Sequence, residues 1–230
     1  MENKIIVYHG SKEIISKPTF GKGKLHNDFG LGFYCTEYQH LSKEWAVNMN
    51  KDGYCNKYEL DMTCLNILNL NNEKYSILNW IAILVEHRLF SIDNPGVRKA
   101  RQYLIDNFSI NVNSYDAIIG YRADDFYFDY AEQFLNNSIT VTQLGKAMQL
   151  GKLGEQIVIK SQFGFDSLTY LQSTKVLYEE YYKLKQERTH NANKEFLEIL
   201  EQEDDGLYIQ DIIKGGIKND DARIPRNIRS

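Results

Sequence analysis

The sequence predicts an α+β fold, and three observations lead to that class. Short apolar runs rich in β-branched residues occur far apart in the chain, as in KIIVYHG and EQIVIKSQF. Between them lie segments whose apolar residues repeat at helical spacing. Beyond residue 173 the chain becomes charged, tyrosine-rich and helical in pattern. We therefore expect a domain over residues 1–172 and a helical extension over residues 173–230.

The first elements are a strand over KIIVYHG and a glycine- and aromatic-rich stretch, NDFGLGFYCT, at residues 27–36. A helix is expected to follow over TEYQHLSKEWAVNMN. Leu41, Trp45 and Met49 share one face of that helix, and Thr36 is placed to cap it. These elements predict a strand that turns directly into a helix.

Further strands are expected at CNKYELDM, LNILNL, YDAIIGYRADD and EQIVIKSQF. Helices are expected at SILNWIAILVEHRLF, at about residues 95–107, and at AEQFLNN, TVTQLGKAMQLGKL and LYIQDIIKG. Strands and helices thus alternate irregularly, as expected of an α+β chain rather than a parallel α/β one.

Composition limits the classes of function. No apolar run approaches the roughly 18–20 residues of a membrane span, and the first residues have no signal-peptide pattern, so we expect a cytoplasmic protein with no membrane partner. The three cysteines have no CxxC spacing and no histidine pair has metal-ligand spacing, so we expect no metal. The net charge of −4 gives no overall attraction to nucleic acid.

The sequence gives little support for the common nucleotide-binding motifs. The GKGK loop at residues 21–24 could hold phosphate, but we interpret it as a flexible solvated loop. Neither a Rossmann GxGxxG after a strand nor a P-loop motif occurs, so neither of those nucleotide-binding routes is supported.

Three separated groups of residues stand out by their types and order. The first is His9-Gly10-Ser11 at a strand end, the second combines Gly32, Tyr34, Ser42 and Trp45, and the third is Glu155-Gln156 at the start of a late strand. Each group alone has a structural explanation, such as a capped strand end or a core aromatic. Their combination favours a site.

This combination resembles the ADP-ribosyltransferase superfamily, in the His-Tyr-Glu branch that includes poly(ADP-ribose) polymerase catalytic domains and diphtheria toxin. VYHGS is similar to the first motif of that branch, GLGFYC with its downstream serine and aromatic to the second, and GEQIVIK to the third. The resemblance implies a split β-sandwich of two small antiparallel sheets with flanking helices. It also implies NAD+ as co-substrate.

The chain more closely resembles a bacterial family of this fold, over essentially its whole length. The shared stretches are VYHGS, ND(F/Y)GxGFYCT, a downstream WA, YDxIIGYRADD, the QxVxK strand and a C-terminal DDGLYIxDII. That family looks like toxins or defence proteins encoded beside small partner proteins. The resemblance therefore implies a toxin or defence role and a small antitoxin partner.

The resemblance implies a role for each motif residue. The aromatic faces of Tyr34 and Trp45 would hold the flat nicotinamide. Gly10 would offer its backbone to the carboxamide, Ser42 would add a hydroxyl bond, and His9 would hold a ribose hydroxyl. The residues expected to bind NAD+ are His9, Gly10, Ser11, Gly32, Tyr34, Ser42, Trp45 and Arg122.

Two neighbouring residues compete for the catalytic position of the third motif. Alignment with the polymerases selects Glu155, whereas the bacterial family shares the glutamine, Gln156. Neighbouring strand residues point to opposite faces, so only one of them can face the cleft. We favour Glu155, because a carboxylate can stabilise an oxocarbenium-like centre and act as a general base. His9 and Tyr34 complete the predicted catalytic set.

A charged cluster follows the YDAIIGYRADD strand. Arg122, Asp124 and Asp125 could bind the pyrophosphate or an acceptor, since a guanidinium pairs well with phosphate oxygens. The alternative is a structural pair at a strand end.

The sequence thus predicts an enzyme that transfers ADP-ribose from NAD+ to a macromolecule, protein or nucleic acid, and releases nicotinamide. Two alternatives stay open: NAD+ hydrolysis without transfer, and a non-catalytic module that binds a nucleotide or a partner. The C-terminal helices could pack on the domain or bind a neutralising protein.

Overall fold

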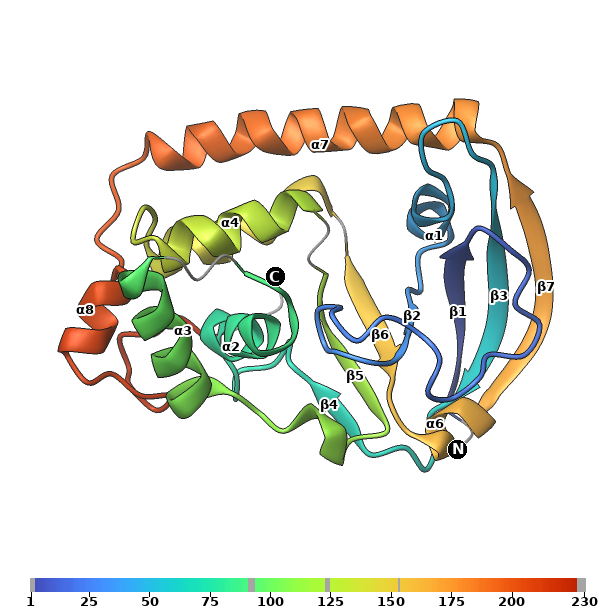
Figure 1. Ribbon diagram of the computed structural model, residues 1–230, viewed down its shortest axis with the longest axis horizontal. Helices are drawn as coiled ribbons and strands as arrows, with labels where there is room; N and C mark the ends of the chain where they lie inside the picture. Colours follow the sequence, from blue (N-terminus) through green and yellow to red (C-terminus); the bar gives the residue numbers. More distant parts are fainter. Residues whose placement is uncertain (1–2, 91–93, 123–124, 153, 227–230) are drawn as a thin grey trace.

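Two small β-sheets form the centre of the computed structural model, which describes residues 3–90, 94–122, 125–152 and 154–226 (Figure 1). The first sheet is antiparallel, in the order β1 (Lys4–Ser11), β3 (Gly53–Asp61), β7 (Leu168–Val176). The second has the order β2 (Phe33–Cys35), β6 (Glu155–Ile159), β5 (Ala117–Tyr121), β4 (Ile67–Asn69). Only its β4–β5 pair is parallel among the described strands. The α+β class with two small, mostly antiparallel sheets is confirmed.

The two sheets meet at one edge, through an isolated bridge. The backbone of Tyr8 in β1 exchanges two hydrogen bonds with the backbone of Thr36, directly after β2. Apolar side chains from both sheets, among them Val7, Tyr58 and Ile157, pack into a shared core beside this junction. Because apolar burial outweighs most other contributions to folding, this core fixes how the sheets face each other.

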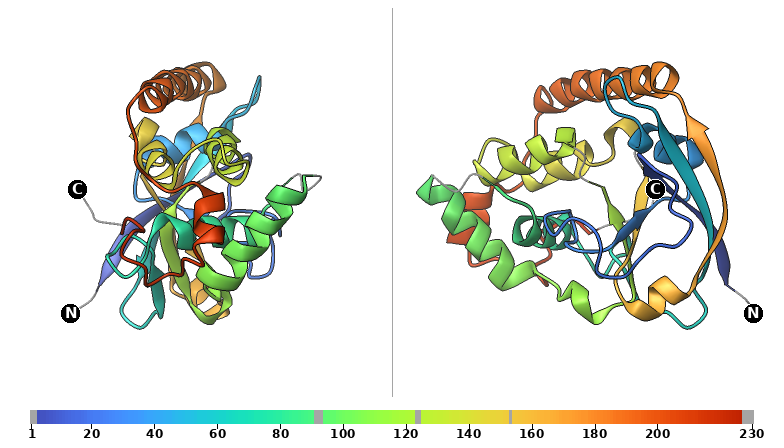
Figure 2. Two further views of the ribbon diagram at one scale, coloured as in Figure 1. Left: turned by 90° about the vertical axis from the view of Figure 1, so that its left-hand side faces the viewer. Right: turned by 45° about the vertical axis from the view of Figure 1, so that its right-hand side comes forward.

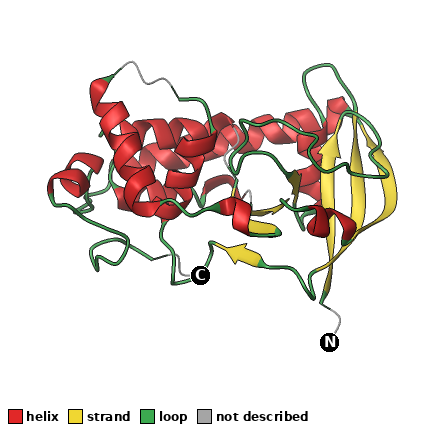
Figure 3. Cartoon of the chain, turned by 60° about the horizontal axis from the view of Figure 1, so that its bottom comes forward, coloured by secondary structure: helices red, strands yellow, loops and turns green. Residues whose placement is uncertain are grey.

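Eight helices occur in the described residues, and most gather beside the second sheet, away from β1, β3 and β7 (Figure 3). They are α1 (Gln39–Ala46), α2 (Ile77–His87), α3 (Pro95–Phe108), α4 (Asp125–Leu135), α5 (Val141–Ala147), α6 (Gln162–Asp166), α7 (Tyr178–Leu200) and α8 (Ile209–Lys214). Two 3₁₀ turns lie at Val112–Ser114 and Leu150–Lys152. Helix α2 is buried along most of its length and is a central element of the largest core. The segments predicted as helices in the middle of the chain are confirmed.

The first helix is shorter than its sequence pattern suggests. Thr36 is not its N-cap, because the helix begins only at Gln39; the Thr36 hydroxyl donates to the Glu155 carbonyl and accepts from the Tyr38 nitrogen over 3.2 Å. Tyr38 occupies the N-cap position instead. Met49 lies beyond the end of the helix, and its side chain is exposed.

The sequence pattern missed strand β7. Its exposed side chains are mostly polar, and Leu171 is an extra residue of β7 opposite Lys57 and Tyr58 of β3, so a bulge in β7 interrupts the pairing. An alternating apolar pattern is therefore absent from the sequence there. The predicted domain boundary after residue 172 falls inside this strand.

Helix α7 follows β7 directly and runs along one side of the molecule, from the first sheet toward α8 (Figures 1 and 2). Arg188 pairs with the buried carboxylate of Glu44 in α1, and Lys43 donates to the hydroxyl of Tyr181 over 2.9 Å. Phe196 packs into the largest core, with its ring centroid 3.9 Å from that of Tyr130. The C-terminal segment thus packs on the domain, as one of the two sequence interpretations expected.

Candidate functional site

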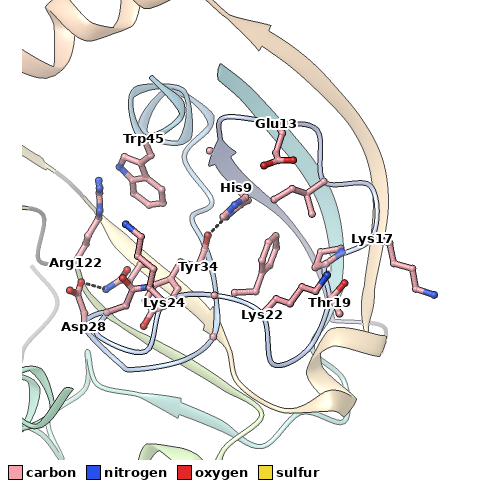
Figure 4. Close-up of a pocket in the computed structure, with 18 of the residues that line it drawn as sticks. His9, Glu13, Lys17, Thr19, Lys22, Lys24, Asp28, Tyr34, Trp45 and Arg122 are labelled. Atoms are coloured by element: carbon pink, nitrogen blue, oxygen red, sulfur yellow. Dashed lines mark hydrogen bonds between the residues drawn. The ribbon is translucent and has the colours of Figure 1, made fainter. Parts of the chain in front are cut away.

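A cavity of about 760 Å³ is lined by residues of both sheets (Figure 4). Strands β1, β2 and β6, helix α1 and the irregular segment over residues 12–32 supply most of its walls. Most of the residues singled out from the sequence line it, namely His9, Gly10, Gly32, Tyr34, Trp45, Arg122 and Gln156. The fold therefore brings the three separated motifs to one place.

His9 lies in the cavity wall as a neutral imidazole. Its Nδ1 is 2.7 Å from the carbonyl oxygen of Tyr34, and its ring stacks on Phe33 with the centroids 4.3 Å apart. A carbonyl oxygen only accepts hydrogen bonds, so Nδ1 carries the proton and Nε2 keeps its lone pair. Burial lowers the pKa of His9, although the bond to Tyr34 opposes this. His9 can therefore accept a hydrogen bond from a ligand hydroxyl at neutral pH.

Tyr34 supplies one side of the cavity and also ties down the chain before it. Its hydroxyl donates to the Gly30 carbonyl over 2.5 Å and accepts from the Phe29 amide over 3.1 Å. Burial, and then the nearby carboxylate of Asp28, raise the pKa of Tyr34 well above its ordinary range. The hydroxyl therefore stays protonated, and Tyr34 offers the cavity an aromatic surface rather than an acid.

The third motif places its glutamine, and not its glutamate, in the cavity wall. Gln156 is buried and lines the cavity, whereas Glu155 is absent from the described lining residues. Glu155 lies opposite Tyr121 in the β5–β6 ladder, and its carbonyl accepts from the Thr36 hydroxyl. This differs from our expectation that Glu155 would face the cleft. The reason is strand alternation, which turns adjacent side chains to opposite faces.

Trp45 and Arg122 meet at the cavity. The guanidinium carbon of Arg122 lies 4.0 Å from the centroid of the Trp45 ring, within the range of a cation–π interaction. The sequence placed Trp45 at the nicotinamide and Arg122 at a phosphate or acceptor. In the structure the guanidinium of Arg122 instead lies over the Trp45 ring at the cavity wall.

The motif glycines are needed for close packing within the chain. A Cβ on Gly10 would lie 2.0 Å from the Ser42 carbonyl oxygen and 2.7 Å from the Ala46 nitrogen, because β1 packs directly on α1. A Cβ on Gly32 would lie 2.6 Å from a methyl group of Val158 in β6. These contacts require glycine whether or not a ligand is bound.

The two motif serines do not line the cavity among the described residues. Ser42 is fully buried, its hydroxyl donates to the Gln39 carbonyl over 2.8 Å, and it contacts the Cys55 sulfur at 2.9 Å. The Ser11 hydroxyl donates to the Glu13 carbonyl and accepts from the Asn56 amide. Their hydroxyls hold α1 and the end of β1 in place. The prediction that Ser42 bonds a ligand is therefore not supported by its position.

Cationic side chains gather around the cavity, and of these the sequence indicated only Arg122 and the lysines of GKGK as candidate ligands of a phosphate. They are Lys17, Lys22, Lys24, Arg88, Arg122 and Lys185. The lysines of GKGK are exposed, as a solvated loop predicts, yet they stand at the cavity edge. The pairing of glycines with lysines was the available signal, whereas no local pattern marks Lys185 in α7.

The carboxylates at the cavity are fewer, and each lies near a cation. Glu13 and Asp28 line the cavity, with Glu13 3.8 Å from the Lys12 ammonium and Asp28 3.8 Å from the Arg88 side chain. Cations in excess of acids favour an anionic ligand at this place.

Several predictions fall outside this geometry. Asp124 lies outside the described residues, and Asp125 is the first residue of α4. In the part of the chain that the structure describes, no group of three or more His, Cys, Asp or Glu side chains is arranged to hold a metal ion. None of the described helices combines the length and apolarity of a membrane span.

Comparison with known proteins gives one match. Residues 5–170 match the model of a family described as "Protein of unknown function (DUF3990)". No curated protein and no solved structure matches the chain. Since the match runs from β1 into β7 and covers well over half of the sequence, the chain belongs to the DUF3990 family.

Proposed function

We propose that the cavity binds NAD+ and that the protein transfers ADP-ribose to a macromolecular acceptor, protein or nucleic acid, with release of nicotinamide. The observation that carries this proposal is the meeting of His9, Tyr34 and Gln156 from three distant motifs at a single cavity. The sequence resemblance gives this combination its chemical meaning, and the charge around the cavity supports it independently.

The size and charge of the cavity suit a dinucleotide. Its volume of about 760 Å³ lies within the roughly 300–1,000 Å³ typical of ligand pockets. Arg122, held against the Trp45 ring, and the exposed Lys22 and Lys24 could neutralise a pyrophosphate. Tyr34 offers an aromatic face for the nicotinamide ring.

The reaction breaks the bond between nicotinamide and C1′ of the ribose. The bonding electron pair leaves with nicotinamide, positive charge develops on the ribose, and a nucleophile of the acceptor then bonds to C1′ and loses its proton. We propose that His9, through Nε2, and Gln156, through Oε1, accept hydrogen bonds from sugar hydroxyls and hold C1′ in place. Since an amide cannot take a proton, Gln156 contributes by hydrogen bonding and not as a base.

Labelled NAD+ added to a cell lysate with the purified protein tests the transferase proposal. We expect macromolecular label with wild type and little or none with Gln156→Ala. Separate digestion with protease, RNase and DNase then identifies the acceptor class. Absence of label from every fraction would contradict transfer.

The same assay separates the two alternatives. Free ADP-ribose without macromolecular label would indicate NAD+ hydrolysis. Bound NAD+ with no turnover would indicate a binding module.

A toxin or defence role, with a small neutralising partner protein, is the biological part of the proposal and rests on the sequence resemblance. We expect production of the wild-type chain in a bacterium to arrest growth, and Gln156→Ala to relieve the arrest. Normal growth with wild type at the same protein level would contradict a toxic activity.

A further inference from the structure

Asp28 is a buried acid in the cavity wall, and the proposed function gives it no role. Its side chain is 7% exposed. Its Oδ2 accepts from Nε2 of Gln156 over 2.9 Å, shown as a dashed line in Figure 4, and its Oδ1 lies 3.8 Å from Nε of Arg88. Burial of a carboxylate is unfavourable unless partners compensate for it, so a retained buried acid calls for a specific explanation.

The segment around Asp28 is held from several sides. Gly30 adopts a φ of +72°, which closes a tight turn, and its nitrogen donates to the Asn27 carbonyl over 2.9 Å. The ring of Phe29 is fully buried in the core. The ammonium group of Lys160 donates to the Phe29 carbonyl over 2.7 Å, and its burial lowers the pKa of Lys160 to about 8. Asp28 therefore occupies a defined position.

The amide group of Gln156 is constrained by two acceptors. Besides Asp28, its Nε2 donates to the backbone carbonyl of Tyr121 over 2.9 Å. Both hydrogens of the amide nitrogen are thereby used, which fixes the orientation of the group. Its oxygen, Oε1, accepts no hydrogen bond from the described residues and belongs to a side chain that lines the cavity.

This arrangement explains why an amide occupies position 156. A glutamate there would put an acceptor oxygen in place of the Nε2 donor, against both the Asp28 carboxylate and the Tyr121 carbonyl, with no proton to share. The acidic group of this part of the wall is instead Asp28, which lies far from Gln156 in sequence.

We propose that Asp28 is a positioning residue that orients the Gln156 amide so that Oε1, and not Nε2, is presented to the ligand in the cavity. The catalytic consequence rests on the proposed NAD+ chemistry, whereas the orientation itself does not. In that reaction Oε1 accepts a hydrogen bond from a sugar hydroxyl. A flipped amide would turn its Nε2 hydrogens toward that hydroxyl, and the hydroxyl could no longer donate to Gln156.

The orientation is tested in the free protein by NMR. The side-chain N–H signals of Gln156 are assigned by their loss in Gln156→Ala, and their exchange with water is measured. In wild type and in Asp28→Asn, which keeps an acceptor oxygen, we expect both protons to be protected. In Asp28→Ala we expect one proton to lose at least about tenfold in protection, the effect of one hydrogen bond of about 1.4 kcal/mol.

Asn27→Ala is the matched control for this measurement. The Asn27 side chain is next to Asp28 in sequence but forms no hydrogen bond with Gln156 in the structure. Its removal should leave both Gln156 signals unchanged. The positioning role is contradicted if Asp28→Ala leaves both protons protected, or if Asp28→Asn loses protection as Asp28→Ala does.

Kinetics then test the consequence. We expect Asp28→Ala and Gln156→Ala each to lower kcat by about 30-fold, since small misplacements can cost up to about 100-fold, with KM changed less than about threefold. The double variant should be no slower than either single one, because both changes remove the same interaction. Asp28→Asn should stay within about threefold of wild type.

The outcomes distinguish the two proposals. Additive losses in the double variant, or a collapse of kcat in Asp28→Asn, would contradict positioning while leaving ADP-ribose transfer intact. Protected Gln156 protons in a wild-type protein that neither binds nor consumes NAD+ would support the orientation and contradict the proposed function.

Discussion

The cavity has two sides that are built differently. One side comes from strand ends and the segment before β2, where His9, Tyr34 and Gln156 are each fixed by hydrogen bonds of 2.5–2.9 Å to the backbone. The other comes from the irregular loop over residues 12–24, whose lysines stand exposed. That loop is attached at few points, such as the Ile15 amide on Asn56 and the Phe20 ring against Phe165.

This difference suggests that the two sides contribute differently to ligand binding. The strand side can hold a ligand group in one orientation, because its polar atoms have defined directions. The loop side supplies positive charge, which attracts an anion without demanding exact geometry. Changes on the strand side should therefore affect folding and turnover, and changes on the loop side should affect affinity.

The largest expected effect comes from removing the support of the strand side. Truncation after residue 172 cuts β7 and removes Val176, Ala192 and Phe196 from the apolar cores. That loss should exceed the roughly 5–15 kcal/mol by which a domain is stable, so the fragment should show no cooperative urea unfolding. A fragment that unfolds cooperatively, with the circular dichroism of a folded protein, would show instead that the extension is separable.

Gly10→Ala should be the most damaging single change on the strand side. Its Cβ would overlap backbone atoms of α1 that cannot move away cheaply. We expect a loss of about 3 kcal/mol in the free energy of unfolding. Gly145→Ala in α5 is the control, because no atom lies within 4 Å of its added Cβ, and it should be neutral or stabilising by up to about 1 kcal/mol. Equal effects of the two substitutions would contradict close packing at Gly10.

On the loop side, the double change Lys22→Gln/Lys24→Gln should leave folding unchanged and weaken NAD+ binding. We expect a loss of about 5- to 10-fold at low salt, shrinking toward none in about 1 M salt, because exposed charges are screened. Isothermal titration at two salt concentrations measures this. Lys99→Gln/Lys194→Gln removes the same charge from exposed positions outside the cavity lining and should have no effect. A similar loss of affinity in that control would show that the weaker binding follows from the overall charge of the protein and not from the position of Lys22 and Lys24.

The smallest effect should be a pH dependence of stability at His9. Its folded pKa lies below the unfolded value because of burial, so the unfolded state binds more protons in acid. His9 therefore destabilises the folded state progressively as pH falls from about 6.5 toward its lower folded pKa. His9→Gln should reduce the loss of unfolding free energy between pH 7 and 5, by urea titration. His9→Gln should remove only part of this acid-side loss of unfolding free energy, since burial also lowers the pKa of His40 and His87. An unchanged acid-side loss would contradict a buried neutral His9.

The sequence allowed the strand side to be predicted far better than the loop side. Glycines, aromatics and β-branched runs report local geometry, so the strands carrying His9, Tyr34 and Gln156 were found. The choice between Glu155 and Gln156 depends on which strand face is turned inward, which the register with β2 and β5 decides. That register follows from long-range pairing and is absent from local pattern.

The remaining features depend on contacts between segments far apart in the chain. Asp28 acquires its partner from a strand near the other end of the domain, so no local signal marks it. Lys185 reaches the cavity because α7 packs across α1. Most exposed side chains of β7 are polar, so its sequence does not show the alternating apolar pattern of a strand.

The assignment of Gln156 to the reacting site is tested by nicotinamide release from NAD+ by wild type, Gln156→Ala and Glu155→Ala, with folding of each variant confirmed by circular dichroism. We expect release by wild type, a rate about 30-fold lower with Gln156→Ala, within the roughly 100-fold that small misplacements can cost, and a rate near wild type with Glu155→Ala. Loss of release in Glu155→Ala with retention in Gln156→Ala would contradict the assignment of the cavity wall. No release by wild type, in the presence of lysate as acceptor, would contradict the proposed reaction itself.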